Sequence, residues 1–180
     1  MSLQLFHSLE GQKIRFKPMS VEDAQAIHDY ASDELVSRFI GWRLMKTANE
    51  TKEYVEVMME RERAGTHYYA SIVLQSTQEV IGTAMIFHFD EEANHAEIGY
   101  VFHRDHWGKG YGTESVAMMS DFAFEILQLH KLHASVVDAN GGSARILEKN
   151  GYQLEGRLKD HYYIEGTYYD ALLLGRIQPS

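Results

Sequence analysis

Hydrophobic and polar residues along this chain follow two periods, one near two residues that favours strands and one near 3.6 that favours helices. Runs rich in aromatic and β-branched residues predict strands at 14–17, 68–74, 80–89, 96–102, 133–137, 152–158 and 169–174. Apolar residues at helical spacing predict helices at 20–30, 47–63, 112–129 and 143–150. This succession of strands and helices is typical of an α/β fold with a mixed sheet.

The predicted helix boundaries depend on capping residues. Ser20 is followed by acidic residues, and Thr47 forms a capping box with Glu50. Gly65 and Gly151 are expected to end the second and fourth helices. Short polar turns separate the three strands between 68 and 102, so these strands are expected to form an antiparallel meander.

The composition adds limits to this picture. The 180 residues are 44% hydrophobic and 24% charged, which excludes a disordered chain, a collagen and a simple coiled coil. Only two prolines occur and no stretch has linker composition, so we expect one domain over residues 1–180. The absence of cysteine excludes disulfides, thiolate metal sites and cysteine nucleophiles.

The charge and the apolar runs restrict the expected partners. A net charge of −9 argues against nucleic acid, which requires clustered basic residues. No apolar run approaches the ~18 residues of a membrane span, and residues 1–10 lack the pattern of a signal peptide. We therefore expect a soluble, cytoplasmic protein that binds neither nucleic acid nor membrane.

The most informative segment joins the strand at 96–102 to the helix that follows it. It contains Trp107-Gly108-Lys109-Gly110-Tyr111-Gly112-Thr113, a glycine-rich turn that opens a helix. Such a turn offers unpaired N–H groups and the positive end of a helix dipole to an anion. The turn does not match the Walker A motif, because the sequence contains no Gly-Lys-Ser/Thr. It does not match the G-x-G-x-x-G motif either, because Thr113 stands where the third glycine belongs. A plain helix cap and another nucleotide site stay open as alternatives.

Two motifs together resemble one known family. The turn fits the pattern [Q/R]-x-x-G-x-[G/A] through Gly110 and Gly112, with Trp107 in the first place. A second segment contains Asn140-x-x-Ser143 and then Glu148-Lys149-Asn150-Gly151-Tyr152. These segments resemble the acetyl-CoA motifs of the GCN5-related N-acetyltransferase (GNAT) superfamily, from about residue 14 to residue 174. The strand at 96–100 and the tail at 155–170 resemble its RimJ/RimL branch, which includes ribosomal-protein N-acetyltransferases.

The resemblance implies the GNAT fold and acetyl-CoA as cosubstrate. That fold has a mixed, mostly antiparallel sheet of about seven strands, helices on both faces, and a splayed parallel pair, here 96–102 and 133–137. Acetyl-CoA would lie in the splay. The implied cofactor-binding residues are Tyr100, Val101, Phe102, Trp107, Gly108, Lys109, Gly110, Tyr111, Gly112, Thr113, Asn140 and Ser143. No metal is implied, because His103 and His106 have no third ligand nearby in the sequence.

The implied reaction is direct attack of a neutral amine on the thioester carbon. Glu97 is the candidate base; alternatively, it pairs with a cation or binds the substrate. A strand N–H near Val101 or Phe102 is expected to stabilise the oxyanion. Leu147 stands where many family members carry a tyrosine that acts as the general acid. Ser143 is the substitute proton donor for the departing thiolate, unless the thiolate leaves unprotonated. The alternative role for Asn140 and Ser143 is an N-cap of the helix at 143–150, which Ser143 would satisfy well, and the two residues can divide these roles between them.

The acceptor is expected to be a protein N-terminal α-amine or a small amine such as a polyamine, an amino acid or an antibiotic. Trp42, Arg43 and Glu97 are the expected substrate-binding residues, and the loops at 37–46 and 162–169 are the expected acceptor walls. A homodimer is compatible with the resemblance. The alternative from another class is a non-catalytic acyl-CoA-binding module, which Leu147 in the tyrosine place supports best.

Overall fold

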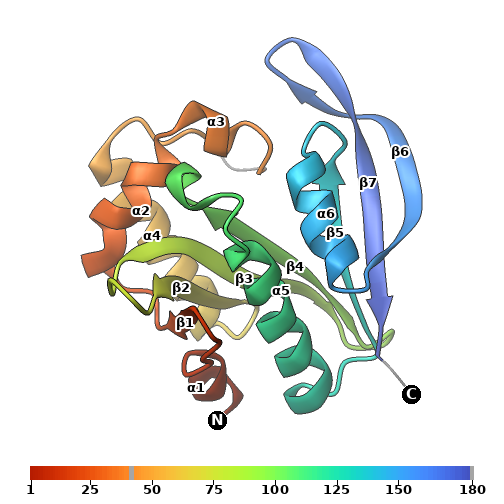
Figure 1. Cartoon of the computed structure of the whole chain (residues 1–180), viewed down its shortest axis with the longest axis horizontal. Helices are drawn as coiled ribbons and strands as arrows, with labels where there is room; N and C mark the ends of the chain where they lie inside the picture. The colour runs from red at the N-terminus through yellow and green to blue at the C-terminus, as the bar shows by residue number, and fades with distance from the viewer. Residues whose placement is uncertain (41–42, 179–180) are drawn as a thin grey trace.

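Seven strands, the number that the sequence predicts, form one sheet in the order β1-β2-β3-β4-β5-β7-β6 (Figure 1). The structure is a computed structural model that describes residues 1–40 and 43–178. The strands are β1 (Ile14–Lys17), β2 (Tyr68–Leu74), β3 (Val80–Asp90), β4 (His95–Phe102), β5 (Lys131–Val137), β6 (Gln153–Ile164) and β7 (Thr167–Ile177). All neighbouring strands are antiparallel except β4 and β5. The expected mixed, mostly antiparallel sheet is confirmed.

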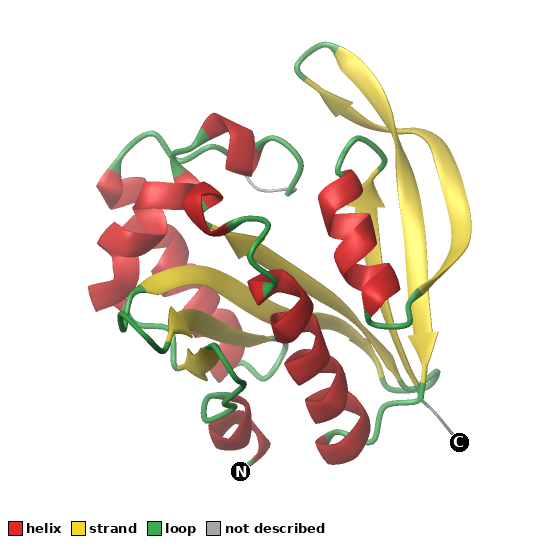
Figure 2. Cartoon of the chain, viewed as in Figure 1, coloured by secondary structure: helices red, strands yellow, loops and turns green. Residues whose placement is uncertain are grey.

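Helices cover both faces of this sheet (Figure 2). The α-helices are α1 (Ser2–Phe6), α2 (Ala24–Ala31), α3 (Glu34–Ser37), α4 (Ala48–Arg63), α5 (Tyr111–Asp121) and α6 (Gly141–Lys149). Shorter helical turns lie at Val21–Asp23, Arg104–His106 and Phe122–Ile126.

The sheet separates two hydrophobic clusters. On one face, α5 and α6 bury Val116 and Leu147 against strand residues such as Ile98. On the other face, α2 buries Ile27 in a cluster that includes Val101. Successive side chains of a strand point to opposite faces, so β4 contributes to both clusters. Each fully buried side chain of this size stabilises the fold by roughly 1.5–3 kcal/mol.

The parallel pairing of β4 with β5 is short. Its residue pairs are His95–Lys131, Ala96–Leu132 and Glu97–His133. Beyond these pairs, β4 continues to Phe102 along β3, and β5 continues to Val137 along β7. The two strands diverge toward their carboxyl ends (Figure 1), as the resemblance implies. We call the space between them the β4–β5 wedge.

Both predicted N-terminal caps are confirmed. The side chain of Ser20 accepts a hydrogen bond from the N–H of Glu22, and Asp23 completes a capping box before α2. The side chain of Thr47 accepts from the N–H of Glu50 at 3.2 Å, and the Glu50 carboxylate accepts from the N–H of Thr47 at 3.3 Å. Local hydrogen bonding therefore determines where α4 begins, and where the helical turn at Val21–Asp23 that leads into α2 begins.

Two predicted helix boundaries are wrong. The helix expected at 112–129 starts at Tyr111 and ends at Asp121, because a π-helical turn at Phe122–Ile126 follows it. The helix expected at 143–150 starts at Gly141, and its cap is Asn140 rather than Ser143. The side-chain oxygen of Asn140 accepts from the N–H of Ser143 at 3.3 Å, so the hydroxyl of Ser143 is not the cap.

The C-terminal hairpin is longer than predicted. Instead of strands at 152–158 and 169–174, β6 and β7 extend to a tight turn at Glu165 and Gly166, where both residues have positive φ. The segment expected as a loop at 162–169 is therefore the end of a hairpin that rises beside α6 (Figure 1). The sequence pattern predicts neither α1 nor α3, because each has no more than five residues.

Candidate functional site

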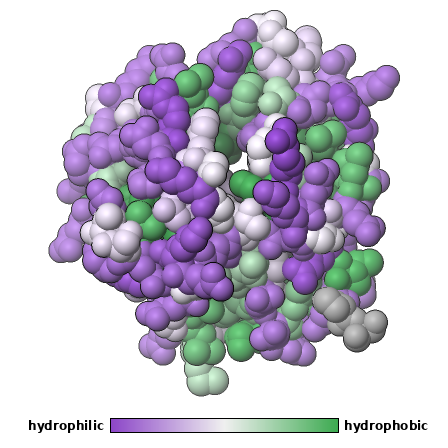
Figure 3. Space-filling view, in the orientation of Figure 1, coloured by the Kyte–Doolittle hydropathy of each residue, from purple (hydrophilic) through white to green (hydrophobic). Residues whose placement is uncertain are grey.

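A cavity of about 840 Å³ opens at the β4–β5 wedge. Its walls come from β4, β5, the start of α6, the segments 37–40 and 43–44, and the end of the β6–β7 hairpin. Figure 3 shows a hollow between the two halves of the molecule, in a surface that is largely hydrophilic. The sequence-predicted site residues that line this cavity are Arg43, Glu97, Tyr100, Val101, Asn140 and Ser143.

The register of β3 and β4 decides which backbone groups face the wedge. The N–H of His103 donates to the carbonyl of Ile81 at 2.8 Å, so the backbone of His103 is directed toward β3. Alternate residues of a strand direct their N–H and C=O groups to the same neighbour. Val101 therefore faces β3, whereas the backbone groups of Tyr100 and Phe102 face the wedge. Of the three residues expected to bind through their backbone, Val101 offers the cavity only its side chain.

Backbone groups of β5 face the wedge from the other side. The N–H of Asp138 donates to the carbonyl of Asp170 at 3.0 Å, which directs its backbone toward β7. By the same alternation, Ser135 and Val137 direct their backbone groups into the wedge. Both walls of the wedge thus present hydrogen-bonding groups of the main chain.

The glycine-rich turn at the start of α5 follows the end of β4, and its residues, like Phe102, are not among those that line the cavity. Gly108 and Gly110 have φ of 71° and 86°, a region that glycine adopts without strain. Within the described residues, the N–H groups from Gly108 to Thr113 donate to no carbonyl, and the first backbone bond of α5 runs from the N–H of Glu114 to Gly110 at 3.1 Å. A run of consecutive amides therefore remains for an anion at the positive end of the helix dipole.

Trp107 differs from its neighbours in this turn. Its N–H donates to the carbonyl of Arg104 at 3.1 Å, so the expectation that this amide binds the pyrophosphate is wrong. Its indole N–H donates to the carbonyl of Phe102 at 3.0 Å. The indole thus fixes the turn against the end of β4 and leaves only the N–H of Phe102 for the wedge.

The turn is also fixed against α6. A Cβ added at Gly112 would lie 2.6 Å from the Cδ1 of Ile146, so glycine permits this close approach of α5 to α6. The side-chain amide of Asn150 donates to the carbonyls of Thr113 at 3.1 Å and Ile146 at 2.9 Å. The two motifs noted in the sequence are therefore in direct contact.

The exposed side chain of Lys109 gives the turn a positive charge. Burial first, and then the nearby charge of Lys109, lower the pKa of His106 below its usual value. A neutral imidazole at this place leaves Lys109 as the cation beside the free amides.

Glu97 lies where the parallel pairing of β4 and β5 ends. Its side chain is 18% exposed, and its Oε2 lies 2.8 Å from the Nδ1 of His88, whose side chain is 68% exposed. The register partner of Glu97 on β5 is His133. Burial lowers the pKa of His133, although the charge of Glu97 acts in the opposite direction. The carboxylate of Glu97 therefore already has a side-chain partner on β3.

Ser143 lies on the opposite wall, in the first turn of α6. Because Asn140 caps this helix, the hydroxyl of Ser143 is available to other groups, and its Oγ lies 2.8 Å from the phenol oxygen of Tyr100. The phenol oxygen of Tyr100 also lies 3.1 Å from the carbonyl oxygen of Ser143. Leu147 is fully buried in the core, so the place of the expected tyrosine does not open onto the cavity.

The outer end of the cavity is bounded by contacts between the segment after α3 and the hairpin. The Nε of Arg38 lies 3.1 Å from the Oε2 of Glu165. The rings of Phe39 and Tyr169 meet edge to face, with their centroids 5.5 Å apart. These contacts bring together the two segments that the sequence suggests as acceptor walls. Of the two predicted acceptor residues after α3, Arg43 lines the cavity and Trp42 lies outside the described residues.

Two site contacts could not be found from the sequence pattern. His88 has a positive φ of 51° and lies within a register shift of β3, and both features place its ring beside Glu97. The side chain of Tyr100 meets Ser143 only because α6 packs beside β4. No local signal marks either contact, because each depends on tertiary structure.

In the described part of the chain, no three histidine, aspartate or glutamate side chains come together as a metal ion would require. Nor does any helix there have the length and apolar character of a membrane span. The rings of His103 and His106 have centroids 5.8 Å apart, in the turn before Trp107.

Comparison with known proteins bears on this site. A family model described as an acetyltransferase (GNAT) domain matches residues 13–153. The chain is 29% identical over 171 residues to the uncharacterized N-acetyltransferase p20 of Bacillus licheniformis, over 95% of this chain and 96% of that protein. It is 22% identical over 168 residues to spermidine N(1)-acetyltransferase of Escherichia coli K12, over 90% of this chain and 84% of that protein.

A solved structure shares the fold. It is RimL, a ribosomal L7/L12 α-N-protein acetyltransferase in complex with coenzyme A, with a TM-score of 0.86 at 18% identity over 94% of this chain and 97% of that chain. At this identity the likeness shows that the two chains share a fold. Because the family model covers most of its length, the chain belongs to the GNAT family of N-acetyltransferases.

Proposed function

We propose that this protein transfers the acetyl group of acetyl-CoA directly to a primary amine. The observation that supports this most strongly is the β4–β5 wedge, which has inward-facing backbone groups on both walls, together with the free amides of the turn that Trp107 holds at the end of β4. A thioester with an amide-containing arm and a diphosphate matches both features. Membership of the GNAT family agrees with acetyl-CoA as the cosubstrate.

The pantetheine arm would bind in the wedge. Its amides would exchange hydrogen bonds with the backbone groups of Tyr100 and Phe102 on β4, and with Ser135 and Val137 on β5. Buried backbone groups need such partners, so the arm and the strands would satisfy one another. Asn140 lines the same wall and offers the N–H groups of its side-chain amide.

The diphosphate would bind at the turn. The N–H groups from Gly108 to Thr113 are directed to no carbonyl within the described residues, and they lie at the positive end of the α5 dipole. Lys109 would add a positive charge at the surface. Trp107 and α6 hold the turn in place before the ligand binds. Binding therefore does not carry the entropy cost of ordering these donors.

The acceptor amine must be neutral before it attacks the thioester carbon. A lysine-type or polyamine nitrogen has a pKa near ~10.4, so its deprotonation at pH 7 costs about 4–5 kcal/mol. An α-amine with a pKa of about 7.7–8.0 costs only about 1 kcal/mol. Glu97, directly or through water, would accept the proton, or would hold the ammonium group before attack. An α-amine therefore needs only a weak base, whereas a polyamine nitrogen needs a stronger one.

Charge develops on the thioester oxygen as the amine attacks. The β4 donors that face the wedge are the N–H groups of Tyr100 and Phe102, so we assign oxyanion stabilisation to one of these rather than to Val101. The C–S bond then breaks, and the electron pair passes to sulfur. Ser143 is the hydroxyl donor on the wall where the sulfur would lie.

The decisive experiment measures thiol release. The protein is incubated with acetyl-CoA and, separately, with N-terminal peptides, polyamines, amino acids and aminoglycosides, and acetylated products are identified by mass spectrometry. Release of free coenzyme A that depends on one amine class supports the proposal and names the acceptor. Absence of release with every amine, despite binding of acetyl-CoA, contradicts it.

A second candidate function is a non-catalytic acyl-CoA-binding module. The burial of Leu147 favours it, because no tyrosine hydroxyl reaches the cavity from that position of α6. The same experiment separates the two functions, since a sensor binds acetyl-CoA and releases no thiol.

A further inference from the structure

Two hydroxyl groups meet across the wedge on its α6 face. Tyr100 comes from β4, Ser143 comes from α6, and both line the cavity. The phenol oxygen of Tyr100 lies 2.8 Å from the Oγ of Ser143 and 3.1 Å from the carbonyl oxygen of Ser143. The phenol is thus close to two acceptors on one residue.

The phenol has one hydrogen, so two arrangements are possible. When the phenol donates to the carbonyl, the hydroxyl of Ser143 donates to the phenol oxygen and is turned away from the wedge. When the phenol donates to the Oγ instead, the hydrogen of Ser143 is released to point into the wedge. A hydroxyl that accepts one hydrogen bond also becomes a stronger donor of the next.

We propose that Tyr100 is a positioning residue, which donates to the Oγ of Ser143 and thereby directs the Ser143 hydroxyl at the departing thiolate. Both hydroxyls keep their protons and act only as hydrogen-bond donors. The electron pair of the broken C–S bond stays on sulfur, and the thiolate takes a proton from solvent after release. The amine proton goes to Glu97 or to water, and this inference rests on the proposed function.

Relative acid strength explains why Tyr100 keeps its proton. A free thiol has a pKa of about 8.5 and a free tyrosine about 10. Burial raises the pKa of Tyr100 further, and the neighbouring Tyr152, which bonds to Ser120 at 3.0 Å, adds to this rise. The phenol therefore stays protonated wherever the thiolate exists, and it is a permanent donor to Ser143.

This arrangement also supplies what α6 lacks. Leu147 is fully buried, so α6 itself brings no phenol to the cavity. The phenol beside Ser143 comes instead from the neighbouring strand, 43 positions earlier in the chain.

The test is the titration of the thiol of coenzyme A bound to the protein, followed by the ultraviolet absorbance of the thiolate. A hydrogen bond to a charged group stabilises it enough to lower the thiol pKa by roughly one to two units. We expect the bound thiol to titrate about one unit lower in the wild type than in Tyr100→Phe or in Ser143→Ala. The double variant is expected to match the single variants, because the two hydroxyls act in series.

A matched control comes from the same cavity. Tyr162 and Ser135 form another tyrosine–serine hydroxyl pair, 2.8 Å apart, so Tyr162→Phe removes a similar bond and is expected to leave the thiol pKa unchanged. Equal thiol pKa values in the wild type and Tyr100→Phe, or an equal shift in Tyr162→Phe, would overturn the inference. If Tyr100→Phe does not fold, an unshifted thiol in Ser143→Ala overturns it instead. Failure of coenzyme A to bind the wild type at all contradicts the proposed function itself.

Discussion

At the scale of single residues, β4 divides the proposed chemistry between the two faces of the sheet. Glu97 shares a face with Val101, on the side of α2 and α4, whereas Tyr100 lies on the side of α5 and α6. The backbone groups of Tyr100 and Phe102 lie between these faces, in the wedge. In the proposed reaction, β4 would therefore present Glu97 as the proton acceptor from one face and Tyr100, with Ser143, from the other. The oxyanion donors would lie between them, in the wedge.

Replacement of Glu97 by glutamine tests its role as the base. Glu97→Gln keeps the size of the side chain and its ability to bond His88, and removes the negative charge. We expect kcat to fall by about 10²-fold, since general-base catalysis contributes on this order, with unchanged affinity for acetyl-CoA. Steady-state thiol release and calorimetric titration measure the two quantities.

A control for Glu97→Gln is Glu165→Gln. Glu165 also lines the cavity but pairs with Arg38 at its outer end, so this change is expected to affect the KM for the acceptor more than kcat. An unchanged kcat in Glu97→Gln would assign the amine proton to another group or to water.

A tyrosine restored at position 147 is expected to harm the fold rather than help the reaction. Leu147 is 0% exposed, so the larger ring of Leu147→Tyr must displace core side chains at a cost of roughly 1–3 kcal/mol. Urea denaturation measures this loss, and Leu147→Met, which keeps the volume, is expected to cost less than about 1.5 kcal/mol. Full stability together with faster turnover in Leu147→Tyr would show that this position can reach the cavity.

Residue roles were predictable where they follow from local pattern. Glycine at 108 and 110 is recognisable because a helix-opening turn needs positive φ, and the turn has it. The bond between His88 and Glu97 was not predictable, because it requires a register shift in β3. The sequence offers both Asn140 and Ser143 as the cap of α6, and the choice of Asn140 appears in the structure.

At the scale of elements, the turn before α5 is the part of the site that a single charge disrupts most directly. A Cβ added at Gly110 meets no atom within 4 Å, so Gly110→Glu does not disturb packing, although φ of 86° strains it. Its carboxylate opposes a diphosphate at the free amides. We expect affinity for coenzyme A to fall tenfold or more, about 1.4 kcal/mol at least, in a calorimetric titration.

The control Gly65→Glu separates charge at the turn from backbone strain. Gly65 also has a positive φ, 75°, and a Cβ there likewise meets nothing within 4 Å, but this residue lies just beyond the end of α4. This variant is expected to bind coenzyme A like the wild type. Equal weakening in both variants would contradict our placement of the diphosphate.

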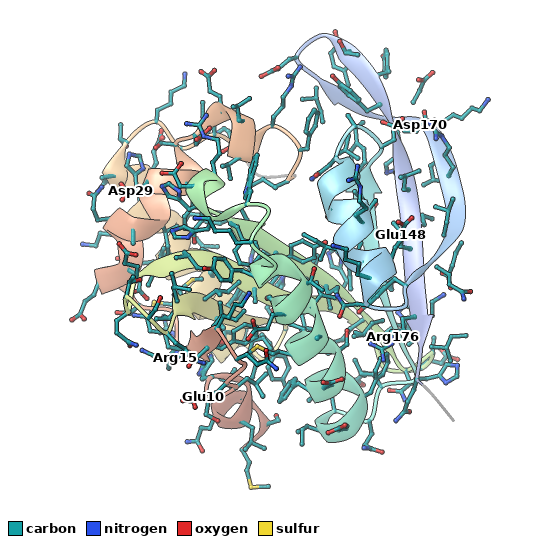
Figure 4. The ribbon with its side chains drawn as sticks, viewed as in Figure 1. Glu10, Arg15, Asp29, Glu148, Asp170 and Arg176 are labelled. Carbon is teal, nitrogen blue, oxygen red and sulfur yellow. The ribbon has the colours of Figure 1, made fainter. Side chains whose placement is uncertain are left out.

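Element positions were predictable to a greater degree than element ends. The starts of α4 and of the helical turn before α2 follow from caps, which are local. The end of α5 does not, because the apolar spacing continues through the π-helical turn at Phe122–Ile126. The length of the hairpin was also hidden. Contacts between distant residues hold the hairpin in place. The side chain of Arg157 on β6 contacts Asp138 after β5 and Asp170 on β7, and Figure 4 labels Asp170.

At the scale of the whole molecule, histidine titration links stability to pH. Burial is the first cause that lowers the pKa of His67, His106 and His133 below the usual 6.5. The unfolded chain then binds protons more readily than the folded chain, so stability falls as pH drops from 6.5 toward the folded values. We expect the melting temperature to decrease between about pH 7.5 and pH 5.5.

The variant His133→Gln isolates one contribution to this slope. It removes the titrating ring, so its melting temperature is expected to change less over the same pH range than that of the wild type. His161→Gln serves as a control, because His161 is exposed. An identical slope in the wild type and in His133→Gln would exclude His133 as a source of the pH dependence.

The short ladder between β4 and β5 has a consequence for cohesion. Among the described residues, β4 and β5 pair at three positions of each strand, from His95–Lys131 to Glu97–His133, and this pairing joins the two halves of the sheet. In the proposed complex, the pantetheine arm would lie between the diverging strands and would bridge their unpaired backbone groups as an additional strand does. Saturation with acetyl-CoA is therefore expected to stabilise the contact between the two halves of the sheet. We expect slower deuterium exchange at the amides of Tyr100 and Phe102 in the complex than in the free protein.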